Sequence, residues 1–145
     1  MAANPGAYDV DHELRRFAYK IEAGAEFAIT QPVFDVDALA RFLARVEQSS
    51  AGPEGRRIPV LAGITPLESL RHAEFMANEV PGVTVPPAII DRMRSAEESG
   101  RAREEGLAIA RELVADLAGR VQGLQITVPA GVFETAVRVL DAIEV

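Results

Sequence analysis

Cysteine and tryptophan are absent from this 145-residue chain, and histidine occurs only twice. Without cysteine there can be no disulfide framework, no thiolate nucleophile and no cysteine-ligated zinc. The two histidines, His12 and His72, lie too far apart in the sequence to suggest a metal site, and we expect both on helix surfaces. The residue types therefore predict no metal centre.

Long hydrophobic runs and an excess of positive charge are also lacking. The apolar run over residues 58–64 is much shorter than the roughly 18 residues that a membrane-spanning helix needs. No charged leader precedes a hydrophobic run at the N-terminus, so we expect a cytoplasmic protein without a membrane partner. A formal net charge of −7 argues against nucleic-acid binding, which requires a surplus of Lys and Arg. Small molecules are the expected ligands.

The composition that is present, 48% hydrophobic and 26% charged, is typical of one globular domain, expected over residues 1–145. Hydrophobic periodicity predicts helices that alternate with short apolar strands. The expected helices cover residues 11–23, 35–48, 65–79, 87–95, 101–117 and 133–143. The expected strands cover residues 26–30, 58–62 and 124–128. We expect residues 49–57 to form an exposed loop.

Helix starts carry the clearest local signals. Residues 65–68 read Thr-Pro-Leu-Glu, so Thr65 is the expected N-cap, followed by a first-turn proline and the Glu of a capping box. Asp9, Asp11 and Asp35 each precede or begin a helix. We interpret these three carboxylates as helix caps and not as catalytic acids.

The order of elements is typical of right-handed βα units around a parallel sheet. Three strands are few for a freestanding doubly wound domain, and the chain has neither GxGxxG nor GxxxxGK[ST]. Residues 2–5 look like the end of a preceding strand. The predicted fold is α/β, the C-terminal half of a (β/α)8 TIM barrel with about three βα units and a preceding helix. The residues after each strand should then share one face: Asn4, Gln31, Gly63 with Ile64, and Thr127.

Three blocks of sequence carry a family resemblance. They are AGAEFAITQPVFD at 23–35, PVLAGITPLESLRHAEFMANEVPGVTVP at 59–86 and GLQITVPAGVFETAVRVL at 123–140. In this order and spacing they resemble the methylenetetrahydrofolate reductase family. Asn4-Pro5 and the ITQPVFD block are most similar to the branch in which the reductase follows a homocysteine methyltransferase domain.

The resemblance implies a barrel that holds FAD, takes hydride from NADH or NADPH, and reduces 5,10-methylenetetrahydrofolate to 5-methyltetrahydrofolate in one-carbon and methionine metabolism. Gln31 matches the family's pterin-contacting glutamine, and a primary amide can both donate to and accept from the pterin edge. Phe75 matches an aromatic position beside folate or nicotinamide, with ordinary core packing as the alternative. Thr127, after the last strand, is the third expected substrate contact.

The resemblance also places flavin contacts. Lys20 matches a flavin-contacting lysine, although a solvated helix face would explain it too, and Asn4 falls where relatives have a flavin-contacting His or Asn. Glu13 and Arg16 are weaker candidates, because many relatives have other residues there. Gly63 and Gly82 are expected where the backbone must turn or come close to a ligand.

Two elements of the family pattern are not in this chain. Many relatives have a ligand-holding arginine near the position of Gly131, and this chain has none there. The general-acid glutamate and most flavin-binding strands belong to the N-terminal half of the barrel, so we expect no catalytic residue here and inactivity of these residues alone.

Several readings of the chain stay open. A partner half in cis or trans, a methyltransferase domain and a homo-oligomer are the expected assembly partners. The alternative function is a non-catalytic half-barrel that binds or assembles. A carbon–carbon lyase barrel would need a Schiff-base lysine after a strand, where none stands.

Overall fold

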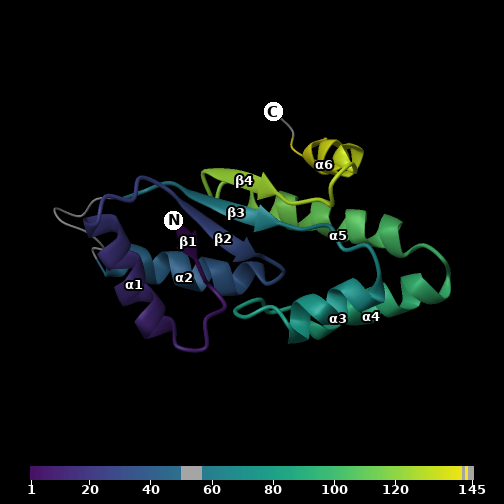
Figure 1. Cartoon of the computed structure of the whole chain (residues 1–145), viewed down its shortest axis with the longest axis horizontal. Helices are drawn as coiled ribbons and strands as arrows, with labels where there is room; N and C mark the ends of the chain where they lie inside the picture. Colours follow the sequence, from purple (N-terminus) through teal and green to yellow (C-terminus); the bar gives the residue numbers. More distant parts are fainter. Residues whose placement is uncertain (50–56, 142, 144–145) are drawn as a thin grey trace.

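A computed structural model describes residues 1–49, 57–141 and 143, so the expected loop at 49–57 falls almost wholly outside the described residues. Its centre is a sheet of parallel strands in the order β1-β2-β3-β4 (Figure 1). The strands are β1 (Ala2–Ala3), β2 (Ala28–Pro32), β3 (Val60–Ile64) and β4 (Gly123–Ile126). Residues 2–5 thus begin with a fourth strand, as expected, and the parallel α/β architecture is consistent with a partial (β/α)8 barrel.

The helices confirm the expected alternation. They are α1 (Val10–Glu22), α2 (Val36–Gln48), α3 (Leu70–Asn78), α4 (Pro87–Glu98), α5 (Ala102–Leu117) and α6 (Phe133–Leu140). Helix α4 runs three residues beyond its expected end, and strands β2 and β3 each begin two residues later than expected. Among the described residues, none of the helices is long and apolar enough to span a membrane.

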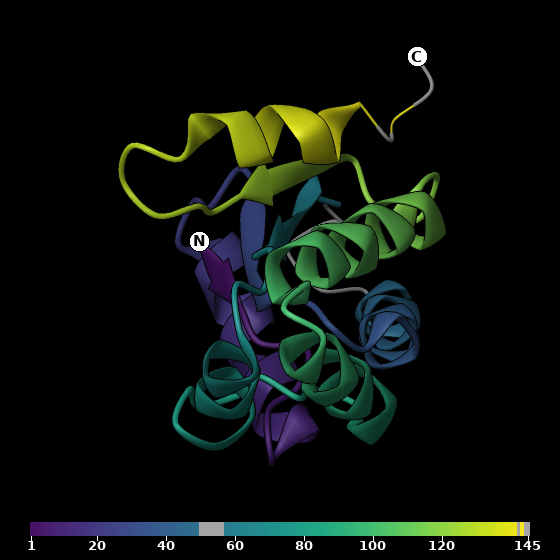
Figure 2. The same cartoon turned by 90° about the vertical axis from the view of Figure 1, so that its right-hand side faces the viewer.

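Alternation along the strands separates the two faces of the sheet. Ala28 and Thr30 of β2, and Val60 and Ala62 of β3, are buried. They face the side covered by α2 and α5 (Figure 2). The residues between them point to the opposite face of the sheet. There Leu61 lies between Ile29 and Gly123, and all three are only half-buried. In a closed barrel this second face would line the interior.

Helix α1 joins the covered face through an aromatic pair. Phe17 of α1 and Phe42 of α2 meet edge to face, with ring centroids 5.7 Å apart and an interplanar angle of 82°. Both rings are buried in one cluster with Ala3, Ala28 and Val60. The apolar spacing of these helices therefore orients α1 and α2 together against the first three strands.

Two of the three expected aspartate caps are confirmed. Asp9 accepts a hydrogen bond from the His12 backbone N–H at 2.8 Å, and Asp35 accepts one from Ala38 at 2.9 Å. Asp11 as a cap is wrong: it lies in the first turn of α1 and forms an ion pair with Arg45 of α2. Asp9, two residues earlier, already occupies the capping position.

The expected helix start at Thr65 is also wrong, because α3 begins at Leu70 with Ser69 as its N-cap. The Ser69 hydroxyl accepts from the His72 N–H at 3.0 Å, and His72 Nδ1 accepts from the Glu68 N–H at 3.3 Å. Leu67 is buried, and a Cβ at Gly106 of α5 would overlap its carbonyl. Close packing of the Leu67 backbone on α5 thus outweighs the local capping signal.

Ser69→Ala should therefore destabilise the fold by about 1 kcal/mol, because the His72 N–H loses its cap. Thr65→Ala, the matched control, should change stability by less than about 0.5 kcal/mol. Thermal unfolding followed by circular dichroism measures both. A larger loss for Thr65→Ala than for Ser69→Ala would contradict the assignment.

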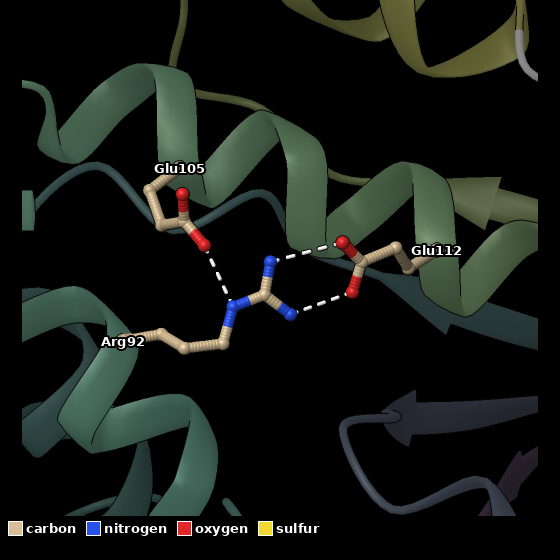
Figure 3. A network of polar contacts seen from close by, with 3 residues as sticks. All are labelled: Arg92, Glu105 and Glu112. Atoms are coloured by element: carbon tan, nitrogen blue, oxygen red, sulfur yellow. Dashed lines mark hydrogen bonds and ion pairs between the residues drawn. The ribbon is translucent and has the colours of Figure 1, made fainter.

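An arginine on α4 ties this helix to α5 (Figure 3). Arg92 donates to Glu112 through both terminal nitrogens, at 2.6 and 2.9 Å, and through Nε to Glu105 at 2.6 Å. The hydrogen bonds from Arg92 lower the pKa of Glu112, and those to Glu112 and Glu105 raise the pKa of Arg92. The bidentate geometry fixes α4 against α5 more firmly than a single-contact pair would.

Arg92→Gln should cost about 1 kcal/mol at pH 7, a modest value because the pair is partly solvated. Since the Glu112 pKa is depressed in the folded state, its contribution is present above the ordinary glutamate pKa and is lost as pH falls through the folded value. The stability difference between wild type and variant should thus shrink below about pH 4. Urea unfolding at pH 7 and pH 3 measures it; a difference that grew in acid would contradict the assignment.

Candidate functional site

A bulge in β2 shapes the carboxyl-end edge of the sheet. Ile29 pairs with Leu61 and Pro32 pairs with Gly63. Two residues of β2 therefore lie between these pairs, where β3 has only one. The buried Thr30 hydroxyl accepts from the Gly63 N–H at 2.9 Å and donates to the Gln31 carbonyl at 2.8 Å. At the extra residue, the Thr30 side chain thus takes the place of a backbone carbonyl as acceptor for the Gly63 N–H. Bulges of this kind are common beside binding sites.

Gln31 lies in this bulge and is half-buried. It lines a cavity of about 20 Å³ together with Gly6, Gly82 and the start of α2. That volume suits roughly one water molecule and not a bicyclic ring. A ring-sized ligand would therefore contact Gln31 from outside this cavity. Gly63 lies within β3, where a Cβ would come 2.8 Å from the Thr30 carbonyl oxygen, so this glycine permits a close approach of β2 and does not form a turn.

Asn4 and Glu13 form a second part of the same edge. The Asn4 N–H donates to Glu13 Oε1 at 3.1 Å, and Glu13 is 4% exposed. Gly82 has a φ of +78° and a Cβ there would overlap the Asn4 carboxamide, so the turn expected at this glycine is confirmed. Asn4 Oδ1 is buried without a hydrogen-bond partner among the described residues. Such an orphaned acceptor points to a missing donor.

The other two expected flavin contacts lie on α1. Arg16 is exposed, with its guanidinium 3.5 Å from Glu13 Oε2. Lys20, in the last turn of α1, donates from Nζ to the Ala2 carbonyl at 2.8 Å. Its ammonium keeps two further donors, but the observed bond is to the backbone of β1. Arg16 thus adjoins the Asn4–Glu13 pair, and Lys20 is tied to the sheet.

Phe75 on α3 is 54% exposed, so the alternative of ordinary core packing is wrong for this ring.

Thr127 follows β4; its N–H donates to the Ile64 carbonyl at 2.9 Å, and its hydroxyl accepts from Gln125 Nε2 at 2.9 Å. Gln125 of β4 pairs with Gly63 of β3, so β3 separates it from the bulge in β2. Its side chain shares the half-buried face with Leu61.

Gln125 was not expected as a site residue. Its position, two residues before Thr127 in a strand, could have indicated it, because alternate strand residues share a face. The structure therefore brings Asn4, Glu13, Gln31 and Gly82 together and places Gln125 with Thr127 across β3. The described residues bring together no group of three or more His, Cys, Asp or Glu side chains able to hold a metal ion.

The fold is similar to that of a solved protein from Clostridium thermocellum, described as an uncharacterized protein that binds two copies of 5-methyl-5,6,7,8-tetrahydrofolic acid. The TM-score is 0.57 at 21% sequence identity, over 89% of this chain and 46% of that one. At this identity the likeness supports the partial-barrel fold.

Two curated relatives come from Schizosaccharomyces pombe, methylenetetrahydrofolate reductase 1 and methylenetetrahydrofolate reductase 2. They are 28% identical over 110 and 109 residues respectively, 72% of this chain in each case. The matched region is 17% of the length of each relative. The family model for methylenetetrahydrofolate reductase matches residues 2–128. With most of its length matched and the partial-barrel fold in place, the chain belongs to the methylenetetrahydrofolate reductase family.

Proposed function

We propose that this chain supplies one half of a flavin-dependent reductase barrel that converts 5,10-methylenetetrahydrofolate to 5-methyltetrahydrofolate. Family membership supports a folate-related reductase role. The observation that carries the proposal is the β2 bulge, in which Thr30 and Gly63 hold Gln31 at the carboxyl-end edge of the sheet. Active sites of (β/α)8 barrels lie at this edge.

The residues at the edge fit FAD. Asn4 Oδ1 is a buried acceptor without a described donor, and a ribityl hydroxyl has the chemistry to satisfy it. Glu13 orients Asn4 through its backbone N–H, while Arg16 and Lys20 would supply positive charge toward phosphate or ribose. Bound FAD would carry the hydride from NADH or NADPH to the folate.

For the substrate, we assign Gln31 to the polar edge of the pterin. Its amide can donate and accept at once, and the bulge restrains its backbone. Thr127, at the end of β4, would contact the same ligand. The Gln125 amide donates a hydrogen bond to its hydroxyl and restrains it there. The exposed ring of Phe75 is available to stack on folate or nicotinamide.

The proposal includes an N-terminal half of the barrel, in cis or in trans, that supplies the general-acid glutamate and the remaining flavin-binding strands. Helix α6 supports this need, because Phe133, Val137 and Leu140 recur at i, i+4 and i+7 and are 73%, 56% and 47% exposed. Such an apolar stripe is typical of a surface that packs against another element. The form of the Asn4-Pro5 and ITQPVFD blocks leads us to include an attached homocysteine methyltransferase domain in the proposal.

The exposed α6 stripe also favours the second candidate function, a non-catalytic half-barrel that serves assembly. The two candidates differ in one measurable property. A reductase half restores flavin binding and folate reduction when it is combined with the N-terminal half of a family member, whereas an assembly module restores only the complex.

Gln31→Ala tests the substrate assignment in such a completed barrel. Folate binding should weaken by roughly 1–3 kcal/mol, because polar groups of the pterin lose their partner. Reduction of the flavin by NAD(P)H should change far less, since that half-reaction does not use the pterin edge. Stopped-flow measurement of the two half-reactions separates them, with the exposed Gln48→Ala as control. Equal losses in both half-reactions would show that Gln31 supports the fold and not the substrate.

A further inference from the structure

A second, larger cavity lies farther along the carboxyl-end edge of the sheet, at the ends of β3 and β4. It has a volume of about 140 Å³, is partly open to solvent, and is lined by the loop after β3, the first two turns of α5, the loop after β4 and α6. It shares no lining residue with the cavity beside Gln31. Figure 2 shows α5 and α6, two of the elements that line this cavity, beside β4.

The floor of this cavity is apolar and rigid. Leu67 and Leu107 line it, and both are buried in the main core. The Leu67 carbonyl lies so close to Gly106 that any Cβ there would overlap it, so the loop and α5 cannot separate without breaking a packed contact. An apolar group of a ligand would therefore contact a fixed apolar wall.

The rim of the cavity carries charges of both signs. Arg103 of α5 and Arg138 of α6 line it, as do Glu68 and Glu104. Within residues 1–49, 57–141 and 143, no ion pair involves any of these four side chains. Glu105, the neighbour of Glu104, is by contrast engaged by Arg92. The charges on the rim are thus available to a ligand.

Helix ends add a preference for an anionic group at this cavity. α5 and α6 begin there without a side-chain cap, as α4 does elsewhere, and their first turns carry Glu104, Glu105 and Glu134. Uncapped N-terminal N–H groups attract negative charge, and two arginines offer bidentate geometry to a carboxylate. The two glutamates can accept from an ammonium group.

We propose that this cavity binds a free α-amino acid with an apolar side chain. The carboxylate would meet Arg103 and Arg138, the ammonium would meet Glu68 or Glu104, and the side chain would cover Leu67 and Leu107. Size agrees with this class of ligand: 140 Å³ is well below the about 300–1,000 Å³ of sites for drug-sized molecules, so neither a dinucleotide nor a whole folate fits.

Isothermal titration of the 145-residue chain with L-leucine, L-valine and L-methionine tests the proposal. We expect saturable binding of at least one of them, weakened about tenfold or more by Arg103→Gln and by Arg138→Gln, because each removes a charged hydrogen-bond donor. Arg111→Gln, exposed on α5 and outside the cavity, is the matched control and should bind as the wild type does.

Two analogues of leucine separate the contributions of its charged groups. 4-Methylpentanoate lacks the ammonium and isoamylamine lacks the carboxylate, so each should bind at least about tenfold more weakly than L-leucine. Glu68→Gln or Glu104→Gln, whichever removes the ammonium partner, should weaken binding of the amino acid and leave binding of 4-methylpentanoate unchanged. Circular dichroism confirms that each variant is folded. Absence of binding by all three amino acids, or equal binding of L-leucine and 4-methylpentanoate, would overturn the proposal.

Discussion

The 145 residues produced by themselves are expected to elute from gel filtration without flavin and to leave NADH and NADPH unoxidised with menadione or methylenetetrahydrofolate. The half-buried sheet face around Ile29 and Leu61 and the apolar stripe of α6 would be open to solvent. Binding free energy that is spread over several loops falls steeply when half of them are absent. The same surfaces should cause dimerisation or aggregation.

Flavin absorbance of the eluted peak, read at the same time as its apparent mass, measures this expectation. Addition of the N-terminal half of a family member should restore part of the flavin binding if the surfaces are complementary. Replacement of Val137 by Glu in the α6 stripe is a suitable control, because it should weaken the restored complex without touching the proposed ligand residues. A stoichiometric, monomeric, flavin-bearing species formed by these residues alone would contradict the need for a second half.

Thr30→Val should produce the largest loss of stability among the single substitutions considered. The valine keeps the shape of the side chain but leaves the buried Gly63 N–H without an acceptor and the Gln31 carbonyl without a donor. An unsatisfied buried group such as the Gly63 N–H costs about 1–3 kcal/mol, and the part-buried Gln31 carbonyl should add about 1 kcal/mol, so the two together should cost about 2–4 kcal/mol. Urea unfolding monitored by circular dichroism measures the change.

Thr30→Ser is the matched control, because it keeps the hydroxyl and removes one methyl group, at about 1 kcal/mol. In a completed barrel Thr30→Val should also weaken folate binding, since the bulge would no longer hold Gln31. If Thr30→Val were as stable as Thr30→Ser, the hydroxyl would not hold the bulge.

Much of the fold could be predicted from local patterns. Helices α1, α2 and α5 have apolar residues at helical spacing, and β3 is a continuous apolar run, as a strand covered on one face by helices and on the other by a barrel interior should be. The start of α3 could not be predicted. Local chemistry favoured Thr65, but the long-range contact of Leu67 with Gly106, which no local signal marks, keeps residues 65–68 out of the helix.

The candidate site was partly accessible from the sequence. The resemblance singled out Asn4, Glu13 and Gln31, and the structure places them along one edge of the sheet. The residue that holds Gln31, Thr30, was not singled out, because its role depends on Gly63, 33 positions away. Phe75, by contrast, looked equally suited to a core or a ligand, and only its exposure on α3 decides against the core.

The sequence by itself determined the order of helices and strands, the capping by Asp9 and Asp35, and the family. These depend on residue types at short spacing and on ordered blocks, which need no coordinates. Only the tertiary structure decided the bulge at Gln31, the orphaned Asn4 oxygen, the bond of Lys20 to Ala2 and the cavity between α5 and α6. Each of these depends on residues distant in the chain that meet when parallel strands and their helices pack, and that distance is not encoded in any local pattern.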